Sequence, residues 1–159
     1  MIRLSKIFIA VAIAVFFTVT VINNITDYQK TSLFIQHTLT MDTTAKNPHF
    51  MWRAISNDSL HHVLFISIIL LQSIIALLCW WGIIQMIRHY QSIPFKFTQA
   101  KLPTVLGCSL GFILYGLGFL TIAGQWFMMR ESTFWNVQNS VHTFLTFLGI
   151  SLIYLSHED

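Results

Sequence analysis

The sequence predicts an all-α membrane protein: a four-transmembrane antiparallel helix bundle with a long extracytoplasmic cap between its first and second helices. Of the 159 residues, 55% are hydrophobic and only 9% are charged, whereas roughly a quarter of the residues of soluble domains are charged. Four stretches contain no Asp, Glu, Lys or Arg, namely residues 7–26, 60–87, 102–129 and 132–157. Each is long enough for the ~20 residues that a helix needs to cross a bilayer. Their apolar character does not alternate, which excludes a β-barrel.

These stretches divide the chain into spans and one long loop. Within a single domain, 1–159, we place the spans at residues 7–22, 63–87, 104–127 and 137–155, with residues 23–62 as the outer loop. The helix that forms the third span is expected to start at Pro103, because proline is tolerated in the first turn of a helix. No small-x-small cleavage site follows the first span, so we expect it to be retained as an anchor rather than removed as a signal.

The distribution of Lys and Arg predicts the orientation. One side carries Arg3, Lys6, Arg88, Lys96 and Lys101; the other carries Lys30, Lys46, Arg53 and Arg130, spread over longer segments. The second connection, RHYQSIPFKFTQAK, has three bases and no acid. Because short basic connections stay in the cytoplasm, both termini are predicted to be cytoplasmic and the long loop to face outward.

The outer loop concentrates the charges of the protein. It contains ten ionisable side chains of zero formal charge: Asp27, Lys30, His37, Asp42, Lys46, His49, Arg53, Asp58, His61 and His62. A structureless loop of this length is unusual, so we expect it to fold as a cap. Arg53 has apolar neighbours and is predicted to pair with Asp27 or Asp42. Lys30 and Lys46 are expected to be solvated, with ion pairs worth less than ~1 kcal/mol.

The last outer turn brings more polar and aromatic side chains to the same level. Together with the loop they form the outer-face candidate site, which comprises Asp27, Asp42, Trp52, Arg53, Gln125, Trp126, Trp135 and Asn136. The segments NNITDYQ, FIQHTLTMDTT, MWRAI, GQWFMMRES and WNVQ resemble the signature of a bacterial family of predicted small integral membrane proteins of uncharacterised function. The resemblance implies four spans and a bacterial inner membrane. The chain departs from that pattern at Gln125 and Val137, where the family commonly has an acid and a glycine.

A few residues within the spans indicate how the helices pack. Gln72 is predicted to form an interhelical hydrogen bond worth on the order of 1 kcal/mol. Gly107, Gly111 and Gly118 form a row of small residues that allows close helix approach; we expect packing within the bundle, with a dimer face as the alternative. Cys79 and Cys108 are expected to be buried and reduced.

No strong enzyme signature is present. The chain lacks C-x-x-C, HExxH, a P-loop and a complete G-x-G-x-x-G. Residues 107–111, GCSLG, match G-x-S-x-G but lie in an apolar helix instead of the strand-to-helix turn that a nucleophile elbow requires. We therefore assign no catalytic residue. The favoured function is an accessory or interaction subunit that uses its outer cap and helix faces, in contact with lipid and with another membrane protein or a second copy, but not with nucleic acid.

Two other functions stay open. Five histidines, His37, His49, His61, His62 and His142, are expected at the outer end, where imidazoles could bind haem or a metal in a redox module. Adjacent His61 and His62 cannot both point at one centre, and a lone His142 is more typical of polar packing, so no cofactor is predicted. A transport role would require paired charges or broken helices at mid-membrane, where only Gln72 is polar.

Overall fold

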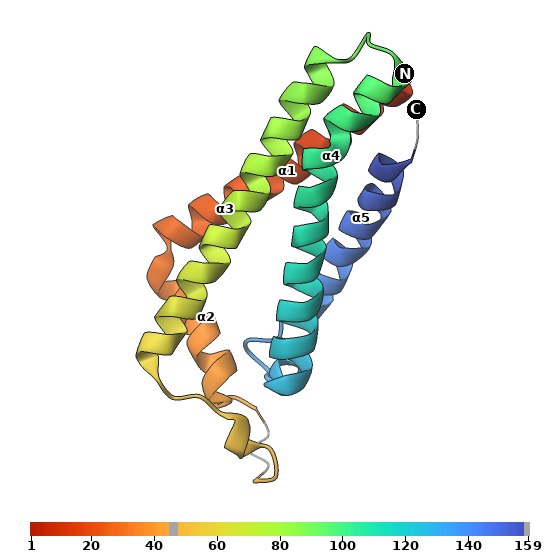
Figure 1. The fold of residues 1–159 in the computed structure, drawn as a ribbon. Coiled ribbons are helices and arrows are strands. Elements are labelled where there is room, and N and C mark those ends of the chain that lie inside the picture. The colour runs from red at the N-terminus through yellow and green to blue at the C-terminus, as the bar shows by residue number, and fades with distance from the viewer. Residues whose placement is uncertain (45–47, 158–159) are drawn as a thin grey trace.

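The computed structural model of the protein describes residues 1–44 and 48–157 (Figure 1). Four of its helices are long and apolar enough to cross a membrane: Ile2–Thr26, Asp58–Arg88, Pro94–Trp126 and Gln138–Ser156. They correspond to α1, α3, α4 (Pro94–Ile113) continued by the π-helix η2 (Leu114–Trp126), and α5. The predicted class, an all-α protein with four membrane-spanning helices, is confirmed.

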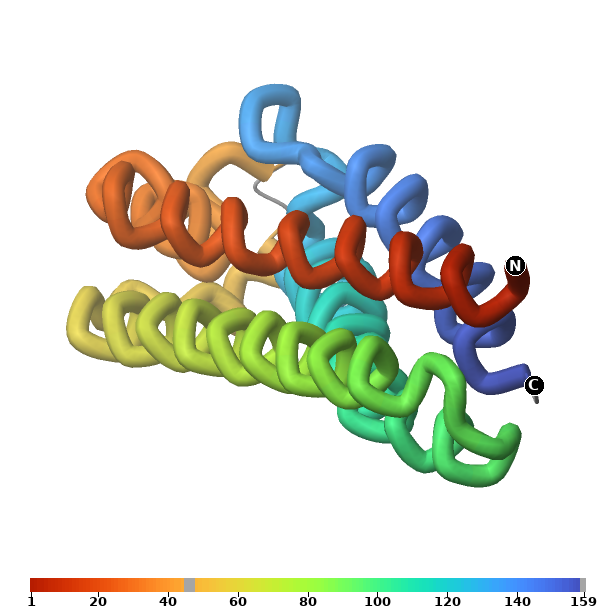
Figure 2. The backbone as a smooth tube through the Cα atoms, turned by 90° about the horizontal axis from the view of Figure 1, so that it is seen from above, coloured from red at the N-terminus to blue at the C-terminus, as the bar shows by residue number. Residues whose placement is uncertain are grey.

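The two ends of the bundle differ in what they contain. The described parts of both terminal regions and the connection between α3 and α4 lie at one end, which we call the terminal end (Figure 1). Helix α2 (Tyr28–Thr40) and the short 3₁₀ helices η1 (Met51–Arg53) and η3 (Met129–Glu131) lie at the other, the α2 end. Between the ends, α3 packs against both α1 and α4, and α5 packs against α4 and η2 (Figure 2).

The third span begins nine residues earlier than predicted. Pro94 occupies the first turn of α4, and Pro103 lies inside the helix, so the predicted start at Pro103 is wrong. Proline fits the first turn because that position needs no intrahelical N–H bond and its φ is already helical. The added segment is part of the packed bundle, since Phe97 and Ala100 are buried. For α3, the side chain of Asn57 caps the helix by accepting a hydrogen bond from the backbone N–H of Leu60.

Glycines bring the helices of the terminal half close together. A Cβ atom on Gly107 would lie 2.9 Å from Cys79 Sγ of α3, and one on Gly111 would lie 2.7 Å from Phe17 of α1 and 3.3 Å from Leu148 of α5. Gly82 of α3 approaches Thr104 of α4 even more closely. Gly107 and Gly111 thus lie at contacts within the bundle, where even a single added carbon would press against a neighbouring helix.

Gly118 does not belong to this row, contrary to the prediction. A Cβ atom there would meet only Leu114 of its own helix, at 3.7 Å. The reason is the change from α4 to the π-helix η2, in which hydrogen bonds join residues five apart; Phe127 N–H, for example, donates to Ile122 O. Residues at α-helical spacing then no longer lie above one another. The periodicity that aligns Gly107 with Gly111 thus ends before Gly118.

The connection from α1 to α3 is folded, as expected. Helix α2 follows α1 after a break at Asp27 and ends at Met41, whose φ of 53° is left-handed, a conformation common at helix C-termini. An apolar cluster lies beneath α2 and joins it to α3 and to the residue after η2. Its buried members are Ile35, Leu39, Met41, Phe65 and Phe127. This cluster fixes the cap on the bundle.

Candidate functional site

Arg53 lies among aromatic rings, not beside an acid. Its guanidinium carbon is 4.4 Å from the ring centroid of Trp126, 4.9 Å from that of Phe50 and 5.3 Å from that of Trp52. Its Nη1 donates to the backbone oxygen of Trp126 at 3.4 Å, while its buried Nε has no hydrogen-bond partner. Over residues 1–44 and 48–157, the recorded ion pairs include none to Arg53. We call Phe50, Trp52, Arg53 and Trp126 the Arg53 cluster.

The predicted pairing of Arg53 with Asp27 or Asp42 is therefore wrong. Asp42 instead accepts from His37, with Nδ1 and Oδ2 2.7 Å apart. Asp27 is exposed at the break between α1 and α2, where its backbone oxygen accepts from Thr31. Aromatic faces can replace a carboxylate here because their negative quadrupole attracts the guanidinium while the flat rings also pack against it.

The other predicted site residues form two further groups at the α2 end. The ring of His37 stacks on Trp135 at a centroid distance of 5.1 Å, which links α2 to the segment before α5. Gln125 accepts from Arg130 Nη1 at 2.9 Å, and Asn136 donates to the backbone oxygen of Arg130 at 3.0 Å. The eight residues of the outer-face candidate site thus lie at one end of the molecule, but they do not all contact one another in a single site. Of the two lysines expected to be solvated, Lys30 is exposed, and Lys46 lies outside the described residues.

Gln72 forms the predicted interhelical hydrogen bonds. Its Oε1 accepts from Asn24 Nδ2 of α1 at 2.7 Å, and its Nε2 donates to the Tyr115 hydroxyl of η2 at 3.4 Å. This buried trio lines a cleft of about 320 Å³ that also reaches α2 and α5. The sequence did not identify Asn24 or Tyr115 as partners, although an amide at the end of the first apolar run and a phenol in the middle of the third are signals that could have been used.

His61 and His62 have different neighbours. His61 Nε2 lies 2.8 Å from Ile55 O, and His62 Nδ1 lies 3.0 Å from the Tyr28 hydroxyl. The side chain of His142 is exposed on α5, so its predicted role in polar packing is wrong. Within residues 1–44 and 48–157, no group of three or more His, Cys, Asp or Glu side chains is placed to hold a metal ion. These contacts give no support to a shared haem or metal site.

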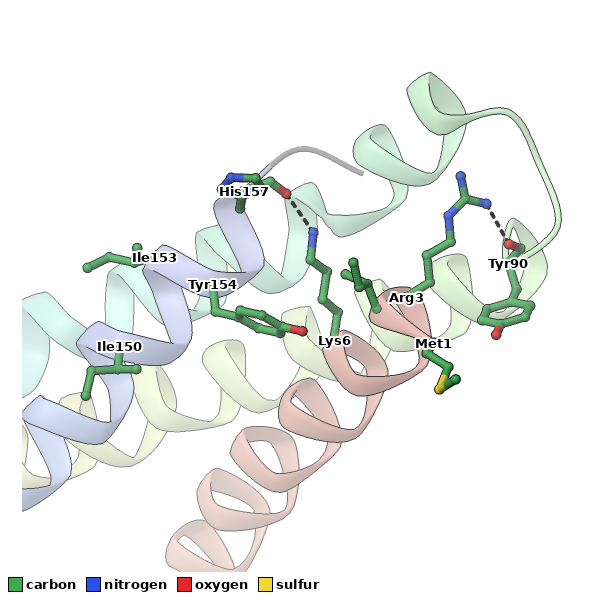
Figure 3. A pocket seen from close by; sticks show the side chains of 9 residues that line it. Met1, Arg3, Lys6, Tyr90, Ile150, Ile153, Tyr154 and His157 are labelled. Atoms are coloured by element: carbon green, nitrogen blue, oxygen red, sulfur yellow. Dashed lines mark hydrogen bonds between the residues drawn. The ribbon is translucent and has the colours of Figure 1, made fainter.

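At the terminal end the sequence analysis missed two buried cations. Lys6 and Lys101 are 1% and 2% exposed. Lys6 Nζ donates to the backbone oxygen of His157 at 2.7 Å (Figure 3). Lys101 Nζ donates to the same oxygen, also at 2.7 Å. Arg3 Nη1 donates to the backbone oxygens of Tyr90 and Ser92, both at 2.7 Å. The burial of Lys6 could have been predicted from helix periodicity. Lys6 lies four and seven positions before the buried residues Ala10 and Ile13, so all three share one face of α1.

Comparisons with known proteins agree with the architecture. No curated protein and no solved structure matches the chain. The model of a family described as "Predicted small integral membrane protein (DUF2165)" matches residues 2–158. With nearly the whole sequence covered and four helices of membrane-spanning length, the chain belongs to this family of small integral membrane proteins.

Proposed function

We propose that the protein is a non-enzymatic accessory subunit of the bacterial cytoplasmic membrane that binds another membrane protein through the Arg53 cluster. The observation that carries the proposal is the exposure of two tryptophans around a cation that has no carboxylate partner among the described residues. Trp52 and Trp126 are 69% and 47% exposed, and their rings meet edge to face with centroids 5.8 Å apart. Trp and Arg are the residues that most often dominate protein–protein binding energy.

The cluster is held in place by the surrounding fold. Phe50, Trp52 and Arg53 come from the connection after α2, whereas Trp126 ends η2. Ile55 N–H donates to Leu39 O, and Thr43 Oγ1 lies 2.9 Å from Ser132 Oγ, so both segments are tied to the cap. A preformed surface loses less conformational entropy on binding. The partner expected from this chemistry presents a carboxylate to the guanidinium and an apolar surface to the two rings.

The orientation follows from the basic terminal end, which carries Arg3, Lys6, Arg88, Lys96 and Lys101. We therefore place the termini in the cytoplasm and the Arg53 cluster on the opposite, extracytoplasmic side. A phosphatase reporter that works only outside the cytoplasm should be active when inserted between Thr43 and Thr44, and inactive when fused after Asp159. The reverse pattern would invert the orientation and move the proposed surface to the cytoplasm.

Site-specific photocrosslinking tests the partner. With a photoreactive residue at position 52, irradiated native membranes should give an adduct heavier than the chain. That adduct should disappear with Arg53→Ala and persist with Lys30→Ala, an exposed cation at the same end. The same photoreactive variant, purified into liposomes, should give no protein adduct.

Three outcomes would contradict the proposal. Lipid adducts alone would make Trp52 a membrane-interface anchor. An adduct between two copies in liposomes would indicate self-association instead. If Arg53→Ala and Lys30→Ala reduced the crosslinked adduct equally, the Arg53 cluster would not be the recognition element. Arg53→Ala is also expected to cost about 1 kcal/mol of cap stability through its aromatic contacts. Thermal unfolding in detergent should show that the variant still folds, which separates lost binding from lost folding.

A further inference from the structure

An open groove of about 1100 Å³ lies at the terminal end, between the start of α1 and the end of α5 (Figure 3). It is larger than the cleft of about 320 Å³ that Asn24, Gln72 and Tyr115 line. The lining residues that matter here are Ile2, Arg3, Lys6, Ile150, Ile153 and Tyr154. The groove therefore has cations where α1 begins and an apolar wall along α5.

Two cations, Arg3 and Lys6, line the basic part of the groove. The two acceptors of Arg3 are backbone carbonyls, which solvate the guanidinium without neutralising it. Arg3 has no carboxylate within ion-pair distance in the part of the chain that the structure describes. The first turn of α1 adds the positive end of a helix dipole.

The apolar wall continues from this charge along the membrane-spanning part of α5. Ile150 and Ile153 are three positions apart, so they lie on one face of the helix. They are 64% and 75% exposed, which means that no other helix of the bundle covers them. Tyr154, whose hydroxyl lies 2.7 Å from Ser5 Oγ, separates them from the cations.

We propose that this groove binds one anionic phospholipid, with Arg3 contacting the headgroup phosphate and an acyl chain lying along Ile150 and Ile153. A cation at the membrane surface above an apolar wall matches the two parts of an amphiphile, and basic pockets between membrane helices are suited to anionic headgroups. Within residues 1–44 and 48–157, both hydrogen bonds of Arg3 use Nη1. The Nε and Nη2 edge can therefore donate two parallel hydrogen bonds to a phosphate. This inference concerns the end opposite the Arg53 cluster and does not depend on the proposed function.

Native mass spectrometry of the purified protein tests the proposal, with phosphatidylglycerol compared with phosphatidylcholine. Phosphatidylglycerol should be retained about tenfold more than phosphatidylcholine, and Arg3→Gln should remove that preference, as expected for the loss of a charge-assisted contact. Arg88→Gln, an exposed cation of the same end outside the groove, should keep it. Equal retention of the two lipids by the parent, or equal loss in both variants, would overturn the site.

A second pair of variants avoids the contacts that Arg3 makes with the α3–α4 connection. Ile150→Trp adds bulk to the exposed wall and should lower phosphatidylglycerol retention, whereas Leu77→Trp, on an exposed position of α3, should not. Retention unaffected by Ile150→Trp would place the lipid elsewhere. Glycerol phosphate at the same concentration should not displace the lipid; full displacement would show that the groove recognises a free phosphate and would overturn the lipid assignment.

Discussion

In the terminal half of the bundle glycines bring neighbouring helices close together, whereas in the half next to α2 the glycines of η2 do not approach α1 or α3. Gly107 and Gly111 lie where a single added carbon would touch a neighbouring helix. Within η2 no glycine makes such a contact with α1 or α3: a Cβ on Gly116 would meet nothing within 4 Å, and one on Gly124 would lie 3.2 Å from Phe119 O of its own helix and 3.6 Å from Gln138 of α5. Two clefts, of about 320 and 200 Å³, lie between η2, α2 and α3 in that half.

The difference shows that small residues mean close packing only while the helix keeps its α-helical spacing. Once the hydrogen bonds of η2 join residues five apart, its glycines leave the row that faces α1 and α3. The α2 end is then held by α2, by aromatic contacts and by the Gln72 trio instead of by close backbone approach. Four changes test this comparison, in order of decreasing expected effect.

Gly111→Leu should have the largest effect. The new side chain would collide with Phe17 and Leu148, so we expect the free energy of unfolding to fall by about 3 kcal/mol or more, or folding to fail. Gly118→Leu, which points toward the cleft between α2 and η2, should change it by less than about 1 kcal/mol. Thermal unfolding in mild detergent measures both. Equal losses would mean that the two halves do not differ in packing.

Gln72→Leu should lower the free energy of unfolding by about 1–2 kcal/mol, because it leaves the buried amide of Asn24 without its acceptor. The double variant Asn24→Leu/Gln72→Leu should recover part of that loss, since both polar groups are then removed. Chemical denaturation in detergent can measure the four members of this cycle. Additive losses would show that the hydrogen bond between α1 and α3 contributes nothing specific.

Arg53→Ala should cost about 1 kcal/mol of cap stability through the loss of its aromatic contacts. A double-mutant cycle of Arg53→Ala with Trp126→Leu should show a coupling of about 0.5–1 kcal/mol. The cycle with Asp42→Asn should show none, because Asp42 accepts from His37 instead. Coupling to Asp42 and none to Trp126 would restore the ion pair that the sequence had suggested.

Asp42→Asn should have the smallest effect, under about 1 kcal/mol, because its contact with His37 is partly exposed and its carboxylate is screened by water. Hydrogen exchange of the α2 amides would detect local opening that thermal unfolding misses. A drop of more than about 2 kcal/mol in the free energy of unfolding would show that the His37–Asp42 pair, not the apolar cluster beneath α2, holds the cap.

The sequence by itself determined the class of protein and the number of spans. Long runs without charge can satisfy their backbone only as helices in a bilayer, and this follows from composition and length alone. It also showed that Gln72 needs a partner from another helix, because an isolated amide in lipid is costly. The small size of Gly107 and Gly111 predicted close packing for the same local reason.

Only the tertiary structure decided which groups meet. Asp27 and Asp42 were each plausible partners for Arg53 by charge, but the fold brings Trp126, from 73 positions later in the chain, against its guanidinium. Similarly, Lys6 and Lys101 share the His157 carbonyl because three separate helices converge at the terminal end. Periodicity describes one helix at a time, whereas the distance between side chains depends on how helices cross, bend and change register, as η2 does.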